Sequence, residues 1–136
     1  LRMERVCNNA FRLAQALEKL EGVSVNYPLL ESSPYHELAE KQLSGKGGAI
    51  LTIRAGSKER AYKLINHLKY VKIATNIGDV RTLVIHPAST IYIHSTPEAM
   101  EEAGVYDDTI RISVGIEDIK DLIQDFTEAV ESLGEE

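Results

Sequence analysis

Apolar residues recur every three or four positions at both ends of the chain, which is the spacing of one face of an α-helix. Near the start they predict a helix over residues 1–22 that ends at Gly22, because glycine readily adopts the left-handed conformation that closes helices. Near the end they predict a helix that begins at Glu117 or Asp118, whose negative charges suit the unpaired N–H groups of a first turn. The apolar positions are Met3, Val6, Ala10, Leu13, Ala14, Leu17 and Leu20 in the first helix, and Ile119, Leu122, Ile123, Phe126, Ala129, Val130 and Leu133 in the last.

Five short runs rich in β-branched residues predict strands between these helices. They cover residues 23–28, 49–55, 71–75, 82–86 and 109–114. The last run alternates most regularly, since Ile110, Ile112 and Val114 point to one face of a sheet while Arg111 and Ser113 point to the other. This alternation predicts a sheet with one apolar face and one polar face, with Arg111 as a cation on the polar face.

Three further helices are predicted between the strands. Ser33 and Pro34 suit the start of a helix that runs to residue 43, and Ser57 suits the cap of a helix over residues 58–69. A short helix over residues 97–104 begins at a proline and ends at a glycine. Together these elements predict an α/β fold, more closely a two-layer α+β sandwich with a mostly antiparallel small sheet and helices on one face.

Composition and charge narrow the possible partners. A chain of 136 residues with 43% hydrophobic content suits one domain with one core. The net charge of -6 disfavours nucleic acid and anionic membrane surfaces, which require a basic face. No apolar run approaches the roughly 20 residues that span a bilayer, so we expect a cytoplasmic protein. The single cysteine, Cys7, and four scattered histidines predict no internal disulfide and no metal site.

Arg111 is the main candidate for chemistry, because a planar guanidinium offers paired donors at the spacing of two carboxylate oxygens. An ordinary arginine on the wet face of a sheet would show the same pattern, so both interpretations stay open. Asn76 is either a second binding residue or a turn asparagine with a left-handed backbone. The glycine-rich residues 44–48 lack the spacing of a phosphate-binding loop, and the acidic pair Asp107 and Asp108 suits an exposed, solvated segment.

Four segments of the chain resemble a known family when they are taken in order. They are LRMERVCNNA, VNYPLLESSPYHELAEKQL, NIGDVRTLVIHPAS and DDTIRISVGIEDIKDLI. Together they resemble the carboxy-terminal part of the pyridoxal-phosphate-dependent enzymes of cysteine and methionine metabolism, which include cystathionine synthases and lyases, methionine γ-lyase and O-acetylhomoserine sulfhydrylase. The turn that begins at Asn76 is most similar to the sulfhydrylases, which have asparagine where the other members usually have serine.

The resemblance implies a fold-type-I enzyme in which a large cofactor domain precedes a smaller substrate-binding domain. Residues 1–136 would be that smaller domain and a part of a longer enzyme, which agrees with a helical pattern that begins at the first residues without a capping residue. By position, Arg111 corresponds to the family's arginine that grips the substrate α-carboxylate, and Asn76 to a neighbouring residue that helps to hold it. Fixing this carboxylate decides which bond at Cα stands perpendicular to the pyridoxal ring and breaks.

The resemblance also indicates what this chain lacks. The family's aldimine lysine lies upstream in a Ser-x-Thr-Lys context, which no lysine of this chain has. We therefore expect the chain alone to bind no pyridoxal 5'-phosphate and to catalyse nothing. The intact enzyme would use that cofactor through an N-terminal domain, act on substrates of the O-acetylhomoserine class and form a homo-oligomer. Ile91 and Tyr92 stand where the family usually has threonine and histidine, so they receive no role.

Several alternatives to the sulfhydrylase stay open. Within the family they are cystathionine γ-synthase, cystathionine γ-lyase and methionine γ-lyase. Outside it, a freestanding regulatory module would bind an amino acid through Arg111 without any chemistry. An interaction domain would instead pair Arg111 with an internal carboxylate.

Overall fold

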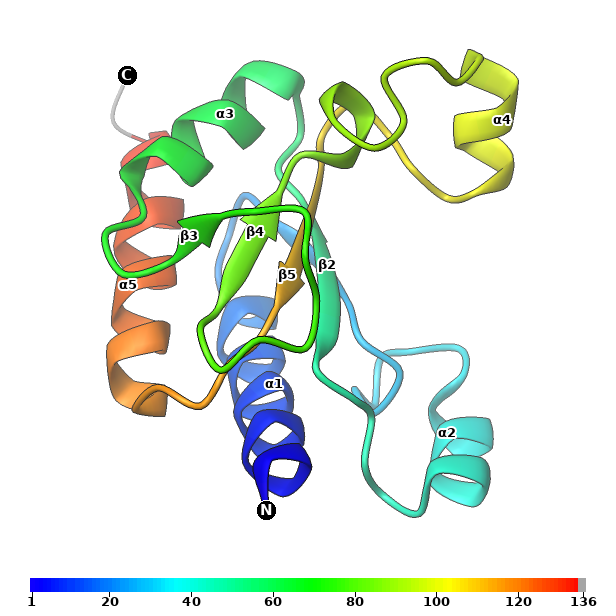
Figure 1. Ribbon diagram of the computed structural model, residues 1–136, viewed down its shortest axis with the longest axis vertical. Helices are drawn as coiled ribbons and strands as arrows, with labels where there is room; N and C mark the ends of the chain where they lie inside the picture. The colour runs from blue at the N-terminus through cyan, green and yellow to red at the C-terminus, as the bar shows by residue number, and fades with distance from the viewer. Residues whose placement is uncertain (135–136) are drawn as a thin grey trace.

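A computed structural model describes residues 1–134, which form α-helices, a five-stranded sheet and two short 3₁₀ turns (Figure 1). The helices are α1 (Arg2–Glu18), α2 (His36–Leu43), α3 (Lys58–His67), α4 (Pro97–Glu102) and α5 (Ile119–Glu131). The strands are β1 (Ser24–Asn26), β2 (Ile50–Arg54), β3 (Lys72–Ile73), β4 (Leu83–Ile85) and β5 (Thr109–Ser113), and the turns are η1 (Pro87–Ser89) and η2 (Ser132–Gly134).

The sheet is small and mostly antiparallel, as the sequence pattern predicted. Its strand order is β1-β2-β5-β4-β3, and only the outermost pair, β3 with β4, is parallel. Strand β5 lies in the middle, where Ile112 faces Leu51 of β2 on one side and Val84 of β4 on the other. Arg111, one position earlier, lies between Thr52 and Ile85.

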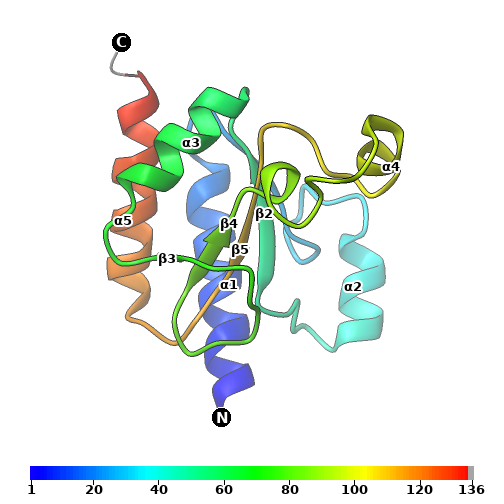
Figure 2. The ribbon, with the colours of Figure 1, turned by 45° about the horizontal axis from the view of Figure 1, so that its top comes forward.

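Helices α1, α3 and α5 form one layer over one face of the sheet (Figures 1 and 2). The apolar face of β5 points into this layer, since Ile110, Ile112 and Val114 are all 0% exposed. Burying such side chains removes apolar area from water and is the main stabilising contribution to the fold. Helices α2 and α4 lie apart from the layer, and together they bury only Ala39.

The predicted capping residues of α3 and α5 are confirmed, whereas the predicted cap of α2, Ser33, is wrong. Ser57 accepts a hydrogen bond from the Arg60 N–H at the start of α3, and Asp118 accepts one from Lys120 at the start of α5. Helix α2, in contrast, begins at His36 rather than at Pro34, because Ser33 accepts from the Tyr35 N–H in a turn that precedes the helix.

The first helix ends earlier than the sequence pattern predicted. Its last residue is Glu18, and Gly22 lies in the following turn with φ of 93° rather than at the helix cap. Leu20 remains packed against the core although it lies outside the helix. The predicted helix was too long because Leu20 lies at helical spacing from the apolar residues before it, although α1 ends at Glu18.

The parallel pairing of β3 and β4 shapes the outer face of the sheet, the face away from the helical layer. Two parallel neighbours cannot be joined by a hairpin, so the chain must cross the sheet between them. Residues 74–82, here called the crossover, run over the outer side of β5 before β4 begins (Figure 1). Ser113 is only 1% exposed on that side. The alternation of β5 had predicted a solvent-exposed outer face. The structure shows instead that part of this face, at Ser113, is buried.

Candidate functional site

Arg111 lies on the outer face of the central strand and is partly exposed. Its Nη2 donates a hydrogen bond of 2.9 Å to the backbone carbonyl of Thr75, in the crossover. Within residues 1–134, no Asp or Glu side chain forms an ion pair with it. An arginine has five N–H donors, so most of this guanidinium is free to bind an anion.

Asn76 follows Thr75 directly and is exposed. The structure thus brings the backbone beside Asn76 against the Arg111 guanidinium, while no hydrogen bond joins the two side chains in the described part of the chain. Asn76 does not have a left-handed backbone, since Ser44 is the non-glycine residue with a positive φ within residues 1–134; the left-handed residue of this turn is Gly78, with φ of 77°. The interpretation of Asn76 as an ordinary turn asparagine stays open.

Two further contacts fix the crossover over β5. The N–H of Gly78 donates to the Ser113 hydroxyl at 3.2 Å, and the N–H of Ile116 donates to the Val80 carbonyl at 2.9 Å. Arg111 and Ser113, two positions apart on the same side of β5, therefore hold the crossover at Thr75 and at Gly78.

Glu117 fixes the far end of the crossover. Its carboxylate accepts hydrogen bonds from both the backbone N–H and the hydroxyl of Thr82, each 2.8 Å long. The Thr82 hydroxyl in turn accepts from the N–H of Gly115. The sequence had indicated Glu117 only as an acid at a helix start, whereas Asp118 is the residue that caps α5.

Helix α1 holds residues 115–117, the segment that follows β5, through side-chain hydrogen bonds. Asn9, which is 0% exposed, donates from Nδ2 to the carbonyls of Gly115 at 3.0 Å and Glu117 at 2.9 Å. Arg5 donates to the carbonyls of Ile116 and Glu117. The residues that follow β5 are consequently tied both to the crossover and to the first helix.

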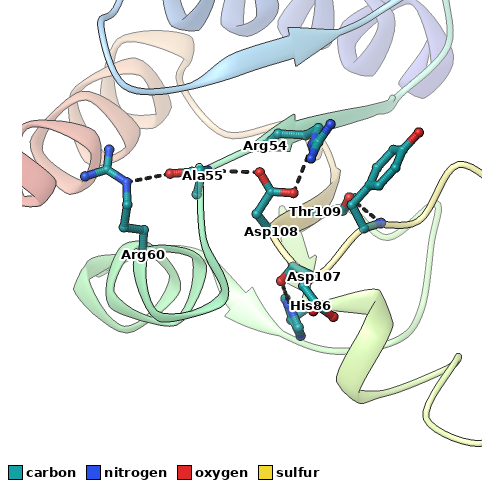
Figure 3. A network of polar contacts seen from close by, with 9 residues as sticks. Arg54, Ala55, Arg60, His86, Asp107, Asp108 and Thr109 are labelled. Carbon is teal, nitrogen blue, oxygen red and sulfur yellow. Dashed lines mark hydrogen bonds and ion pairs between the residues drawn. The ribbon is translucent and has the colours of Figure 1, made fainter. Parts of the chain in front are cut away.

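A second polar cluster lies at the start of β5 (Figure 3). Asp108 is 7% exposed, and its carboxylate accepts from Arg54 Nε at 2.9 Å and from the N–H of Gly56 at 3.0 Å. The Arg54 guanidinium also lies 4.0 Å from the centre of the Tyr106 ring. The interpretation of Asp108 as part of a solvated segment is therefore wrong, because it is a buried partner of Arg54.

His86 is buried and uses both ring nitrogens within the fold. Because the Asp107 carbonyl only accepts, Nε2 carries the proton that it donates there, and Nδ1 lies 2.7 Å from the Ser89 hydroxyl. The ring also meets Tyr62 edge-on. His86 thus uses its ring for contacts within the fold, directly after the end of β4.

No group of three or more His, Cys, Asp or Glu side chains among residues 1–134 is arranged to hold a metal ion. No helix in that part of the chain is long and apolar enough to cross a membrane. Every lysine is exposed.

Comparison with known proteins gives a consistent set of matches. The family model described as Cys/Met metabolism PLP-dependent enzyme matches residues 1–131. A homocysteine synthase from Schizosaccharomyces pombe is 47% identical over 133 residues, covering 96% of this chain and 31% of the relative. An O-acetyl-L-homoserine sulfhydrylase from Thermus thermophilus is 42% identical over 96% of the chain and 31% of the relative. An L-methionine γ-lyase from Fusobacterium nucleatum is 39% identical over 98% of the chain and 34% of the relative.

A solved structure supports the same grouping. It is a Campylobacter jejuni protein described as an O-acetylhomoserine (thiol)-lyase with a pyridoxyl-lysine monophosphate, with a TM-score of 0.92 and 35% identity over 96% of this chain and 31% of that one. The chain therefore spans about a third of the length of the curated relatives and of the solved structure that it matches.

Proposed function

The chain belongs to the Cys/Met metabolism PLP-dependent enzyme family, and we propose that it holds the substrate α-carboxylate in an enzyme similar to O-acetylhomoserine sulfhydrylase. The observation that carries this proposal is the environment of Arg111. Its guanidinium is partly exposed, donates one N–H to the Thr75 carbonyl and pairs with no carboxylate among residues 1–134. A cation without an internal counter-ion on an exposed face suits an anionic ligand.

The hydrogen bond to Thr75 supports this role because it fixes one side of the guanidinium. The remaining N–H groups form a planar fork that matches two carboxylate oxygens, and a fixed fork loses less conformational freedom on binding. Asn76, exposed beside Thr75, adds a neutral amide that can donate to the same carboxylate. By this proposal Arg111 supplies the charge, and Asn76 supplies orientation.

The residues of this chain do not fit the anchoring of pyridoxal 5'-phosphate. All its lysines are exposed, so none offers an amine in an enclosed place where a Schiff base would be protected from water. Part of each matched relative lies outside the region that this chain covers. We propose that the complete protein that contains this chain holds the cofactor on a preceding domain, is cytoplasmic and assembles as a homo-oligomer.

Methionine γ-lyase is a second candidate, favoured by the 39% identity to the enzyme of that name. Both reactions use an amino acid with a free α-carboxylate, so the Arg111 site serves either. The two proposals differ in the sulfur chemistry beyond Cα, which this part of the chain does not decide. They are separated by comparing kcat/KM for O-acetyl-L-homoserine with sulfide, which yields homocysteine and acetate, against kcat/KM for L-methionine breakdown.

The test of carboxylate binding is Arg111→Ala in the complete protein. We expect KM for the amino-acid substrate to rise about tenfold or more, because a charge-assisted pair of hydrogen bonds is lost. Arg12→Ala is the matched control, since Arg12 is exposed on α1 in the other layer. If both variants keep the KM of the unmodified enzyme, Arg111 does not bind the substrate and the proposal is wrong.

A further inference from the structure

Ser113 is buried beside the proposed carboxylate site without touching it. Its side chain lies on the same face of β5 as that of Arg111, and the residue is 1% exposed. Its hydroxyl accepts the hydrogen bond from the N–H of Gly78 in the crossover. Three residues earlier in the crossover, the carbonyl of Thr75 accepts from Arg111. The crossover is therefore the physical link between the two side chains.

The middle of the crossover depends on these contacts, because little of it is buried. Thr75, Asn76, Ile77 and Gly78 are all exposed. Its ends are held by the pairing of β3 with β4 and by the clamp of Glu117 on Thr82. Between Thr75 and Gly78, the hydrogen bonds to β5 within residues 1–134 are the one from Arg111 and the one to Ser113. Without the Ser113 acceptor, Thr75 would keep the bond from Arg111 and the bond of its neighbour Ala74 to the Val84 carbonyl, whereas residues 76–78 would lose their hydrogen bond to β5.

We propose that Ser113 is a positioning residue for substrate binding, which acts through Gly78 and Thr75 on the Arg111 guanidinium. The inference rests on the proposed function of Arg111. The Ser113 hydroxyl holds Gly78, Gly78 holds the adjoining residues 75–77, and the Thr75 carbonyl then fixes the orientation of the Arg111 fork. The same fixation places the Asn76 amide. Such support by buried neighbours is what holds a binding group within a fraction of an ångström of its productive geometry.

The test is Ser113→Ala in the complete protein, with KM and kcat for the amino-acid substrate measured separately. We expect KM to rise about fivefold, the cost of one lost hydrogen bond, while kcat changes less than about twofold. Ser132→Ala is the matched control, because Ser132 is also buried but its hydroxyl donates within the last helical turn, to Ala129. That control should keep the KM of the unmodified enzyme.

A double-mutant cycle with Arg111→Ala separates positioning from general stabilisation. If Ser113 acts through Arg111, Ser113→Ala should change KM by less than about twofold once Arg111 is already absent. Should Ser113→Ala fail to fold, Ser113→Cys keeps a similar volume with a weak acceptor and takes its place in both measurements.

The outcomes distinguish the two proposals. If Arg111→Ala raises KM and Ser113→Ala does not, the inference about Ser113 is wrong while carboxylate binding stands. An equal rise of KM from Ser113→Ala with and without Arg111 also overturns it, because Ser113 would then act elsewhere. If Arg111→Ala itself leaves KM unchanged, both proposals fail.

Discussion

Replacing Gly115 by alanine should destabilise the chain strongly, although a single methyl group is added. Gly115 follows β5 with a backbone that is not left-handed, so an alanine there meets no conformational penalty. The obstacle is space. A Cβ at this position would overlap the Val80 carbonyl oxygen and would lie 2.5 Å from Glu117 Oε1 and 2.6 Å from the backbone carbon of Arg81. Two of these three neighbours are backbone atoms, which cannot rotate away.

The loss of stability can be estimated from the residues that the added methyl group would displace. Overpacking of this kind costs about 1–3 kcal/mol. Moving residues 80 and 81 away would also weaken the Ile116 to Val80 hydrogen bond, worth about 1 kcal/mol, and the Thr82 bonds to the Glu117 carboxylate, worth about 1.5–3 kcal/mol. We expect a loss of at least about 3 kcal/mol, which at this chain length lowers Tm by roughly 10 °C.

Urea unfolding of the purified chain, followed by circular dichroism, measures this loss. Gly134→Ala is the matched control, since nothing lies within 4 Å of a Cβ built there, and it should change the unfolding free energy by less than about 0.5 kcal/mol. A Gly115→Ala chain as stable as the Gly134→Ala chain would show that the crossover does not press on Gly115. The anchoring of the crossover described above would then be wrong.

Two other substitutions test separate parts of the fold. Asp108→Asn should lower the unfolding free energy by about 2 kcal/mol in the same urea assay. It removes the charge that faces the half-exposed Arg54, and it places an amide donor against either Arg54 or the Gly56 N–H. The control is Asp107→Asn, at the exposed neighbouring position, which should leave the unfolding free energy almost unchanged. Burial, with a smaller effect of Cys7, raises the pKa of Tyr27, whose hydroxyl donates to the Gly48 carbonyl. Because the pKa is raised in the folded state, the stability from this group is kept below the unfolded pKa of about 10 and is lost above it, by up to about 1.4 kcal/mol per pH unit. Tyr27→Phe should therefore make the fall of the unfolding free energy between pH 10 and 11 shallower. An unchanged slope in Tyr27→Phe would show that another group controls the alkaline loss.

The local features of the fold could be predicted from the sequence because they depend on neighbouring residues. The Ser57 cap acts three residues away, on Arg60, and the alternation of β5 depends on a period of two. The apolar stripe of α5 likewise follows from spacing alone, and its buried face includes Ile119, Leu122 and Phe126. Arg111 was found in the same way, as the cation in a regular strand.

The remaining features depend on residues far apart in the sequence. Glu117 meets Thr82 across 35 positions and Asp108 meets Arg54 across 54, so neither carboxylate could be assigned a partner from local pattern. The parallel pairing of β3 with β4 could not be predicted from local sequence either, because the direction of a strand depends on the route of the segment that connects it to its neighbour. That route also buried Ser113, which looked like a residue on a wet face.

The way the residues after β5 are held explains why the outer face can carry a binding group at all. Asn9 uses both Nδ2 hydrogens on the carbonyls of Gly115 and Glu117, while its Oδ1 is buried without a hydrogen-bond partner among the described residues. An unsatisfied buried acceptor costs free energy, so the two donated bonds must outweigh that cost for asparagine to be favourable there. The two bonds link α1 to the segment whose Glu117 clamps the crossover. The helical layer thereby helps to stabilise an exposed crossover on the opposite face of the sheet, so that Arg111 gives only one N–H to the crossover and its other N–H groups have no acceptor among residues 1–134.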